Sequence, residues 1–325
     1  MRFFSMDLHI SVIADFKSVC PEIEVIDWCL SGHAWVMKRP QDCPEYINPK
    51  TWTCFSPLMI EQFQQKYDTF LRSFDGFIVG HVTCFAMIYE KYNKPIVMIN
   101  SCRYDLPFCW SKDWGMRLKL HECLLRLNSK GLLKAVSNNR ADQLYTKLGS
   151  GIETTYIPSL CLYTKATYTP TKSTFLSYSG SFQENPLITP KSSLPERYEW
   201  SDITSFRGIV HYPYEASLMS VFEQFTAGCP LFFPSKTLWK SYPQIQSISS
   251  YWGDQLPSEL SSMADKAVWI ELADMYEVFQ SPNTHYYDSY EHLLSILTNF
   301  TYVDDKEFRA AHIESVKAKW KALLA

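Results

Sequence analysis

The sequence predicts an α/β protein with two domains, each a parallel sheet flanked by helices. Short apolar runs alternate with segments whose apolar residues recur at helical spacing, which is typical of βαβ units. The chain has 325 residues, more than one domain usually holds, and 46% of them are hydrophobic, enough to bury a sizeable core. Residues 164–174 lie between two such alternating regions, are rich in Thr and Lys, and show no periodicity. We interpret them as a linker.

In the first half, each expected strand is a short apolar run that stops at a polar, Gly or Pro position. These strands cover residues 2–6, 24–30, 76–80, 95–100, 132–137 and 154–158. The expected helices between them cover residues 11–19, 58–73, 84–93, 115–130 and 139–149. The helix over 58–73, for example, spaces Ile60, Phe63, Tyr67 and Leu71 so that they share one face.

The second half repeats this alternation more loosely. Strands are expected at residues 175–181, 206–212, 231–235 and 267–272, and helices at 217–227, 289–299 and 304–322. The predicted organisation is therefore a first domain over 1–165, a linker over 166–174, a second domain over 175–303, and a terminal segment over 304–325. Right-handed crossovers place the carboxyl ends of parallel strands along one edge, where ligands usually bind.

Composition and missing motifs exclude several functions. A net charge of −3 disfavours broad nucleic-acid binding, because affinity for phosphate backbones needs clustered Lys and Arg. The sequence lacks G-x-G-x-x-G, the P-loop pattern, G-x-S-x-G, H-E-x-x-H and D-x-D, so we expect no metal site and no bound cofactor. The ten cysteines form no C-x-x-C pair, and no apolar run is long enough to span a membrane, which favours a cytoplasmic protein with reduced thiols.

The most informative segment is HYPYEASLMSVFEQFTAGCPLFFPS, residues 211–235. It reads as a strand, a turn, a helix that stops at Gly228, and a second strand. Backbone N–H groups near Ser217, Leu218 and Met219 would bind an anion such as a diphosphate at the start of the helix. Glu223 lies two turns into the helix, and its carboxylate would accept both hydroxyls of a ribose.

This segment resembles the E-x(7)-E region of GT-B glycosyltransferases, especially the retaining family-four type. The matching residues are Pro213, Glu215, Glu223, Gly228 and Pro230. VGH (79–81), AVSNNRADQLYTKLG (135–149) and YIPSL (156–160) are similar to elements of that family and occur in the same order. The resemblance implies two Rossmann-like domains that face each other across a cleft, with the helix over 304–325 packed back on the first domain.

For the second domain, the resemblance implies a nucleotide-sugar site. Glu215 would lie in the donor-sugar or diphosphate region, and Gly180 and Ser181 would offer backbone donors after the first strand of this domain. Ser235 and Lys236 would follow a strand end beside the donor. The basic pair of the family has no obvious counterpart, and the candidates for it are Lys191, Arg197, Arg207 and Lys236.

For the first domain, the candidate residues follow the expected strands at the carboxyl edge. His81 would contact the sugars, and His9, His33 or His81 would be the general base if the enzyme inverts configuration. Asp7 and Arg103 would bind the acceptor. Trp110 and Trp114 lie in a loop-like segment and are candidates for stacking on sugar rings.

The hypothesis is therefore a metal-independent, retaining glycosyltransferase. It would move a sugar from a UDP- or GDP-linked donor to a glycan or glycosylated acceptor, with the nucleotide sugar as substrate and no cofactor. Two alternatives stay open: a nucleotide-sugar epimerase of GT-B type, which needs no acceptor, and a non-catalytic carbohydrate-binding protein with the same fold.

Overall fold

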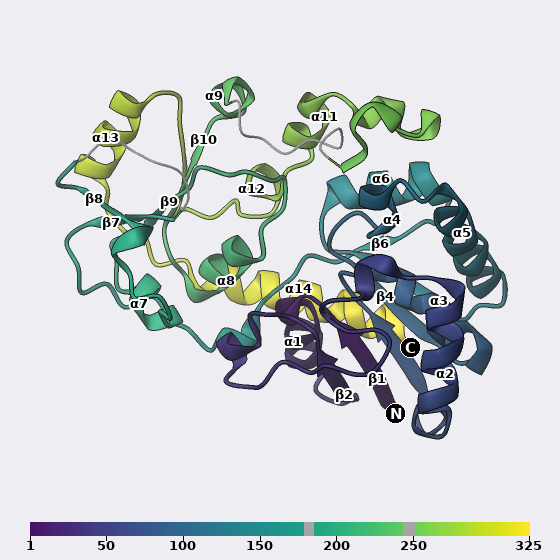
Figure 1. Cartoon of the computed structure of the whole chain (residues 1–325). Helices are drawn as coiled ribbons and strands as arrows, with labels where there is room; N and C mark the ends of the chain where they lie inside the picture. The colour runs from purple at the N-terminus through teal and green to yellow at the C-terminus, as the bar shows by residue number, and fades with distance from the viewer. Residues whose placement is uncertain (179–184, 243–250) are drawn as a thin grey trace. The chain divides into compact units, whose positions relative to one another are not determined.

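The computed structural model describes residues 1–178, 185–242 and 251–325, and it confirms the α/β class with two Rossmann-like parallel sheets. The chain divides into two compact units (Figure 1). The first unit comprises Met1–Ser159, Ile248–Ala264 and Lys319–Ala325; the second comprises Leu160–Ser247 and Asp265–Ala318. The predicted linker is hydrogen-bonded along the second unit, where the N–H of Thr169 donates to Thr204 O at 3.2 Å.

The sheet of the first unit has six parallel strands in the order β2-β1-β3-β4-β5-β6. Their bounds are β1 Arg2–Asp7, β2 Glu24–Cys29, β3 Gly76–Val79, β4 Ile96–Asn100, β5 Leu133–Ser137 and β6 Thr155–Tyr156. All residues of β3 and β4 are buried, as expected for central strands covered on both faces. All six strands occur where the apolar runs predict them.

The helices cover both faces of this sheet. They are α1 Ile10–Val19, α2 Pro57–Arg72, α3 Ala86–Tyr89, α4 Phe108–Ser111, α5 Trp114–Ser129 and α6 Arg140–Ser150. Helices α2, α3 and α5 lie together on one face, and α1 lies on the other (Figure 1). Phe16 of α1 packs edge to face against Trp320 of the last helix, α14 (Lys306–Leu324), with ring centroids 5.2 Å apart.

The sheet of the second unit has five strands in the order β11-β10-β9-β7-β8, and all its neighbouring pairs are parallel. The strands are β7 Phe175–Ser177, β8 Ile188–Pro190, β9 Ile209–Val210, β10 Leu231–Pro234 and β11 Thr284–Tyr287. The helices are α7 Trp200–Thr204, α8 Met219–Ala227, α9 Lys236–Ser241, α11 Lys266–Glu271, α12 Asp274–Glu277 and α13 Tyr290–Asn299.

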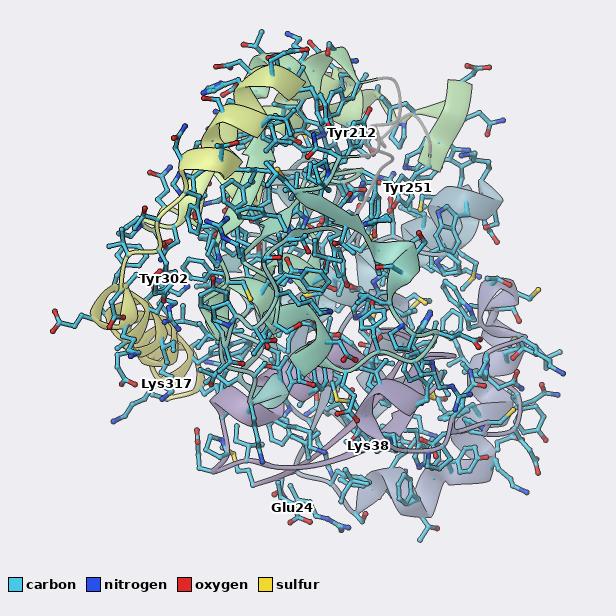
Figure 2. The ribbon with its side chains drawn as sticks, turned by 90° about the vertical axis from the view of Figure 1, so that its left-hand side faces the viewer. Glu24, Lys38, Tyr212, Tyr251, Tyr302 and Lys317 are labelled. Atoms are coloured by element: carbon cyan, nitrogen blue, oxygen red, sulfur yellow. The ribbon has the colours of Figure 1, made fainter. Side chains whose placement is uncertain are left out.

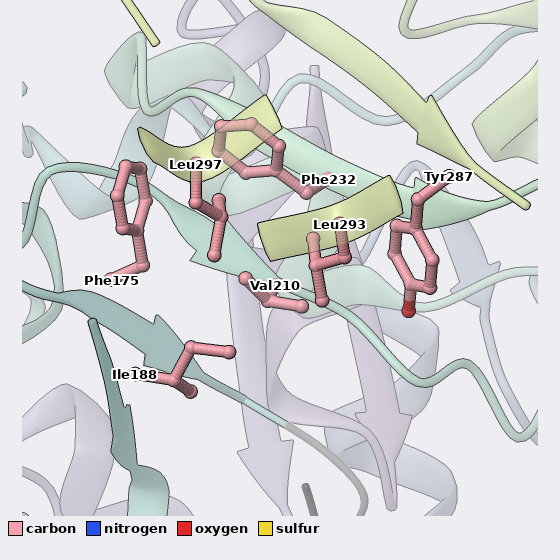
Figure 3. Packing of buried hydrophobic residues seen from close by; sticks show 7 residues of the cluster. All are labelled: Phe175, Ile188, Val210, Phe232, Tyr287, Leu293 and Leu297. Carbon is pink, nitrogen blue, oxygen red and sulfur yellow. The ribbon is translucent and has the colours of Figure 1, made fainter. Parts of the chain in front are cut away.

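Helix α13 closes one face of this sheet. Its Leu293 and Leu297 pack against apolar side chains from all five strands (Figure 3). These side chains are Phe175, Ile188, Val210, Phe232 and Tyr287. Because they come from every strand, this cluster holds the strand order of the second sheet in place.

One predicted strand is wrong. Residues 267–272 form most of helix α11, whose N-terminus is capped by the Asp265 side chain accepting from Ala267 N at 2.8 Å. A short apolar run fits a buried strand or a buried helical turn equally well, and here the cap decides for the helix. Two strands of this sheet were not predicted: the short edge strand β8, and β11, whose sequence THYY carries polar residues at its start.

Both sheets reverse their winding direction at one place. In the first unit, the chain leaves β1 toward β2 on one side and leaves β3 toward β4 on the other. In the second unit, β7 leads to β8 while β9 leads to β10 in the opposite direction. The carboxyl ends of β1 and β3, and of β7 and β9, are therefore the positions where a doubly wound sheet places its ligand.

Candidate functional site: two polar clusters at the strand ends

Asp7 organises the strand ends of the first unit. It is the last residue of β1 and is 3% exposed. Its two carboxylate oxygens accept from the backbone N–H of His9 and of His81, each at 2.9 Å, so one side chain joins the loops after β1 and β3. Burial raises the pKa of Asp7 to about 7, although these backbone donors oppose the shift.

Gly80 makes room for this carboxylate. A Cβ atom at residue 80 would lie 2.0 Å from Asp7 Oδ2 and 3.1 Å from Val12 Cγ1. Only a residue without a side chain fits between β3 and Asp7 in this arrangement.

His9 and His81 lie side by side above Asp7. Their ring centroids are 5.4 Å apart, and both side chains are half-buried. Burial lowers the pKa of His9 to about 4 and that of His81 to about 3; repulsion from His33 adds to the first shift, and repulsion from His9 and Arg103 to the second. Both rings are therefore neutral near pH 7.

The other two predicted residues of this unit lie around the pair. His33 is exposed at the start of a 3-10 helix, Ala34–Met37, and its charge acts on His9. Arg103 follows β4, is 1% exposed, and lies 3.4 Å from a carboxylate oxygen of Asp142. The structure thus brings Asp7, His9 and His81 into one cluster, with His33 and Arg103 within electrostatic range.

In the second unit, α8 begins beside the end of β9. Leu218 occupies the N-cap position and its side chain makes no capping hydrogen bond. Residues 217–220, which include the predicted Ser217, Leu218 and Met219, are partly exposed. The start of α8 therefore presents the positive end of the helix dipole to an accessible position.

Glu223 is held by two aromatic donors. Tyr163 OH donates to Oε1 at 2.5 Å, and Trp200 Nε1 donates to Oε2 at 3.2 Å. Burial raises the pKa of Glu223, while these two bonds and the charge of Lys191 act in the opposite direction. A carboxylate has about four acceptor positions, so each oxygen keeps capacity for one more donor.

Lys191 provides a positive charge near Glu223. It follows β8, and its Nζ lies 3.9 Å from the ring centroid of Tyr178 and 5.2 Å from that of Tyr198. The two tyrosine hydroxyls are 3.2 Å apart. The charge of Lys191 acts on both Glu223 and His211. Of the four basic candidates, Lys191 is the one that these interactions place beside Glu223.

Sequence reasoning missed His211 and Gln224 as members of this cluster. His211 follows β9, is fully buried, and its Nε2 lies 2.7 Å from Gln224 Oε1. Its ring stacks on Phe233 with centroids 5.0 Å apart, and burial lowers its pKa to about 4. The available signal was position, since His211 lies near the carboxyl end of the strand expected over 206–212.

The remaining predicted residues have these surroundings. Glu215 is 9% exposed and accepts from the N–H of Ala216 at 3.0 Å. Ser235 caps α9 by accepting from Leu238 N at 3.3 Å, and Lys236 pairs with Glu271 at 2.5 Å. Gly180 and Ser181 lie outside the described residues.

Across residues 1–178, 185–242 and 251–325, no three His, Cys, Asp or Glu side chains form a group suited to a metal ion. Within the same ranges, no helix combines the length and apolar character that crossing a bilayer requires.

The sequence matches no family model and no curated protein. Solved structures that are similar to this chain include the following three. The spinosyn forosaminyltransferase SpnP has a TM-score of 0.46 and 10% identity, with 99% of this chain and 95% of that chain covered. The glycosyltransferase of kitacinnamycin has a TM-score of 0.42 and 9% identity, with the same 99% and 95% covered. The glycosyltransferase SnogD from Streptomyces nogalater has a TM-score of 0.35 and 7% identity, with 87% and 96% covered.

Similarities of this size are too weak to assign a function to this chain.

Proposed function

We propose that this protein is a GT-B type glycosyltransferase that binds a nucleotide sugar on the second unit and its acceptor on the first. One observation carries the proposal: both doubly wound sheets gather polar and titratable side chains at the point where their winding reverses. Ligands of open α/β sheets bind at such points. Two such clusters in one chain suit a reaction with two substrates.

The second unit supplies what a nucleoside diphosphate requires. The start of α8 and Lys191 provide positive charge for the diphosphate. Glu223 is oriented by Tyr163 and Trp200, and it keeps acceptor capacity for ribose hydroxyls. Because these groups are fixed before the donor arrives, they would stabilise the charge that develops on the departing diphosphate.

His9 and His81 of the first unit are the groups to consider for removal of the acceptor proton. A general base works best with a pKa near the operating pH, and His9 and His81 have pKa values of about 4 and 3. They suit hydrogen bonding to acceptor hydroxyls better than proton removal near pH 7. We propose retention, which the resemblance to the family-four type implies: the bond from the sugar C1 to the phosphate oxygen breaks, C1 bonds the acceptor oxygen, and the acceptor proton passes to the departing phosphate oxygen.

Calorimetry with UDP, GDP, ADP and CMP tests the donor site. We expect one nucleotide to bind, and Lys191→Ala to weaken it at least tenfold, equivalent to about 1.4 kcal/mol. Lys240→Ala is the matched control, because Lys240 is an exposed lysine of the same unit. Absence of binding by all four nucleotides, or equal losses in both variants, would contradict the proposal.

Product analysis tests the reaction itself. The wild type with donor and a glycan acceptor should yield a glycoside that keeps the anomeric configuration of the donor. An epimerised nucleotide sugar formed without acceptor would instead support the epimerase alternative.

A further inference from the structure

Two tryptophans of the first unit expose much of their surface. Trp110 lies in α4 and is 48% exposed, and Trp114 begins α5 and is 44% exposed. They are four residues apart. Large aromatic side chains are normally buried or engaged, so a pair this exposed on one short stretch indicates a binding surface.

Two residues far away in the chain, Tyr251 and Trp252, pack against the two tryptophan rings. Tyr251 lies nearly parallel to Trp110, with centroids 6.3 Å apart and planes 18° apart. Trp252 is fully buried and lies against Trp114, with centroids 4.8 Å apart and planes 31° apart. Trp52 meets Trp110 edge to face at 5.6 Å. Two consecutive residues thus each support one exposed tryptophan; Tyr251 is labelled in Figure 2.

This supporting segment is itself firmly attached. Trp252 Nε1 donates to Tyr145 OH at 2.9 Å, and the Lys112 ammonium donates to the backbone carbonyl of Tyr251. Further along, Glu259 accepts from Arg117 at 2.8 Å. The exposed faces are therefore held in place before any ligand binds, which reduces the entropy that binding must overcome.

The surface continues the strand edge that carries the His9 and His81 cluster. Tyr251 also covers the guanidinium of Arg103, which lies 4.4 Å from its ring centroid. Arg103 follows β4, and its charge acts on His81. The series Trp110, Tyr251, Arg103 therefore runs from the exposed rings to the proposed acceptor site.

We propose that Trp110 and Trp114 form a platform on which sugar rings of the acceptor stack. This inference deepens the proposed function, because it names an oligosaccharide as the acceptor class. The apolar C–H face of a pyranose matches a rigid aromatic face. Its hydroxyls would meet polar neighbours, since Ser111 and Asp113, next to Trp110 and Trp114 in the chain, are both exposed.

The test is calorimetric titration of the full chain with maltotriose, cellotriose, chitotriose and lactose. We expect at least one of these sugars to bind. Trp110→Leu should weaken it at least tenfold, whereas Trp110→Phe keeps most of the affinity, because stacking needs a flat aromatic face rather than apolar volume. Leu118→Ala is the matched control: Leu118 is 58% exposed on α5, the helix that Trp114 begins, and its loss should leave sugar binding unchanged.

Three outcomes would overturn the platform: none of the four sugars binds, Trp110→Leu binds as well as the wild type, or Leu118→Ala loses binding equally. Size-exclusion chromatography of the same variants tests whether a second copy of the chain occupies this surface instead of a sugar. A wild-type dimer that Trp110→Leu converts to a monomer would identify a protein contact instead.

Nucleotide binding separates this inference from the proposed function. Sugar binding without nucleotide binding supports the platform alone, and nucleotide binding without sugar binding refutes the platform alone.

Discussion

Gly80 offers the sharpest test of how Asp7 joins two loops of the first unit. A methyl group on residue 80 would lie 2.0 Å from Asp7 Oδ2, more than 1 Å inside ordinary van der Waals contact. The carboxylate is fixed by the N–H groups of His9 and His81 at 2.9 Å each, so it must leave both hydrogen bonds to make room. Overpacking a core costs about 1–3 kcal/mol, and each lost hydrogen bond about 1–1.5 kcal/mol.

We therefore expect Gly80→Ala to lower the free energy of unfolding by about 3–6 kcal/mol, a large part of the stability of an ordinary domain. Urea titration followed by circular dichroism measures this loss. Gly32→Ala is the control, since a Cβ at that position meets nothing within 4 Å. In an Asp7→Ala background the clash is absent, so Gly80→Ala should cost much less there. Equal losses with and without Asp7 would refute this reasoning.

Three further predictions follow from burial and hydrogen bonding. The pKa of Asp7 rises from 3.8 to about 7 on folding, so the folded chain binds an extra proton between these pH values and Asp7 destabilises the fold as pH rises through them. Asp7→Asn should therefore remove on the order of 3 kcal/mol of the pH dependence of stability in urea titrations from pH 4.5 to 8, and an unchanged pH profile would refute it. Trp252→Ala should lower the free energy of unfolding by about 3–5 kcal/mol and speed hydrogen exchange over residues 251–263, because it empties a fully buried indole site. Unchanged exchange there would contradict the conclusion that Trp252 holds this segment in place. Tyr163→Phe should raise the pKa of Glu223, because it removes a donor to the carboxylate; carboxyl NMR titration measures the shift, with Tyr214→Phe, at an exposed tyrosine, as control.

The parts of the fold that sequence predicts well are those fixed by local pattern. Every strand of the first sheet is a short apolar run with a polar or Gly stop, and the structure places all six there. The second sheet is harder, because its strands are only two to four residues long. Strand β11 begins with Thr284 and His285, which gives no apolar run to detect.

The same division applies to the candidate site. Asp7, His9 and His81 were predictable because each lies at or just after the end of a buried parallel strand, and topology brings such ends together. The packing of Tyr251 and Trp252 against Trp110 and Trp114 could not be predicted in this way, because the two pairs are about 140 residues apart in the chain. No local periodicity encodes a contact of that range.

Trp252 and Trp320 belong to the first unit although they lie late in the chain, so the protein cannot be cut into its two units at a single position. A fragment that ends at the predicted linker would include every strand of the first sheet but lack both tryptophans, which fill buried positions in that unit. The fragment would expose the apolar surfaces around Phe16 and Trp114 that these indoles cover. The first half is therefore not a self-sufficient module, and recombination with relatives at the linker would have to carry both late segments along with the first 159 residues.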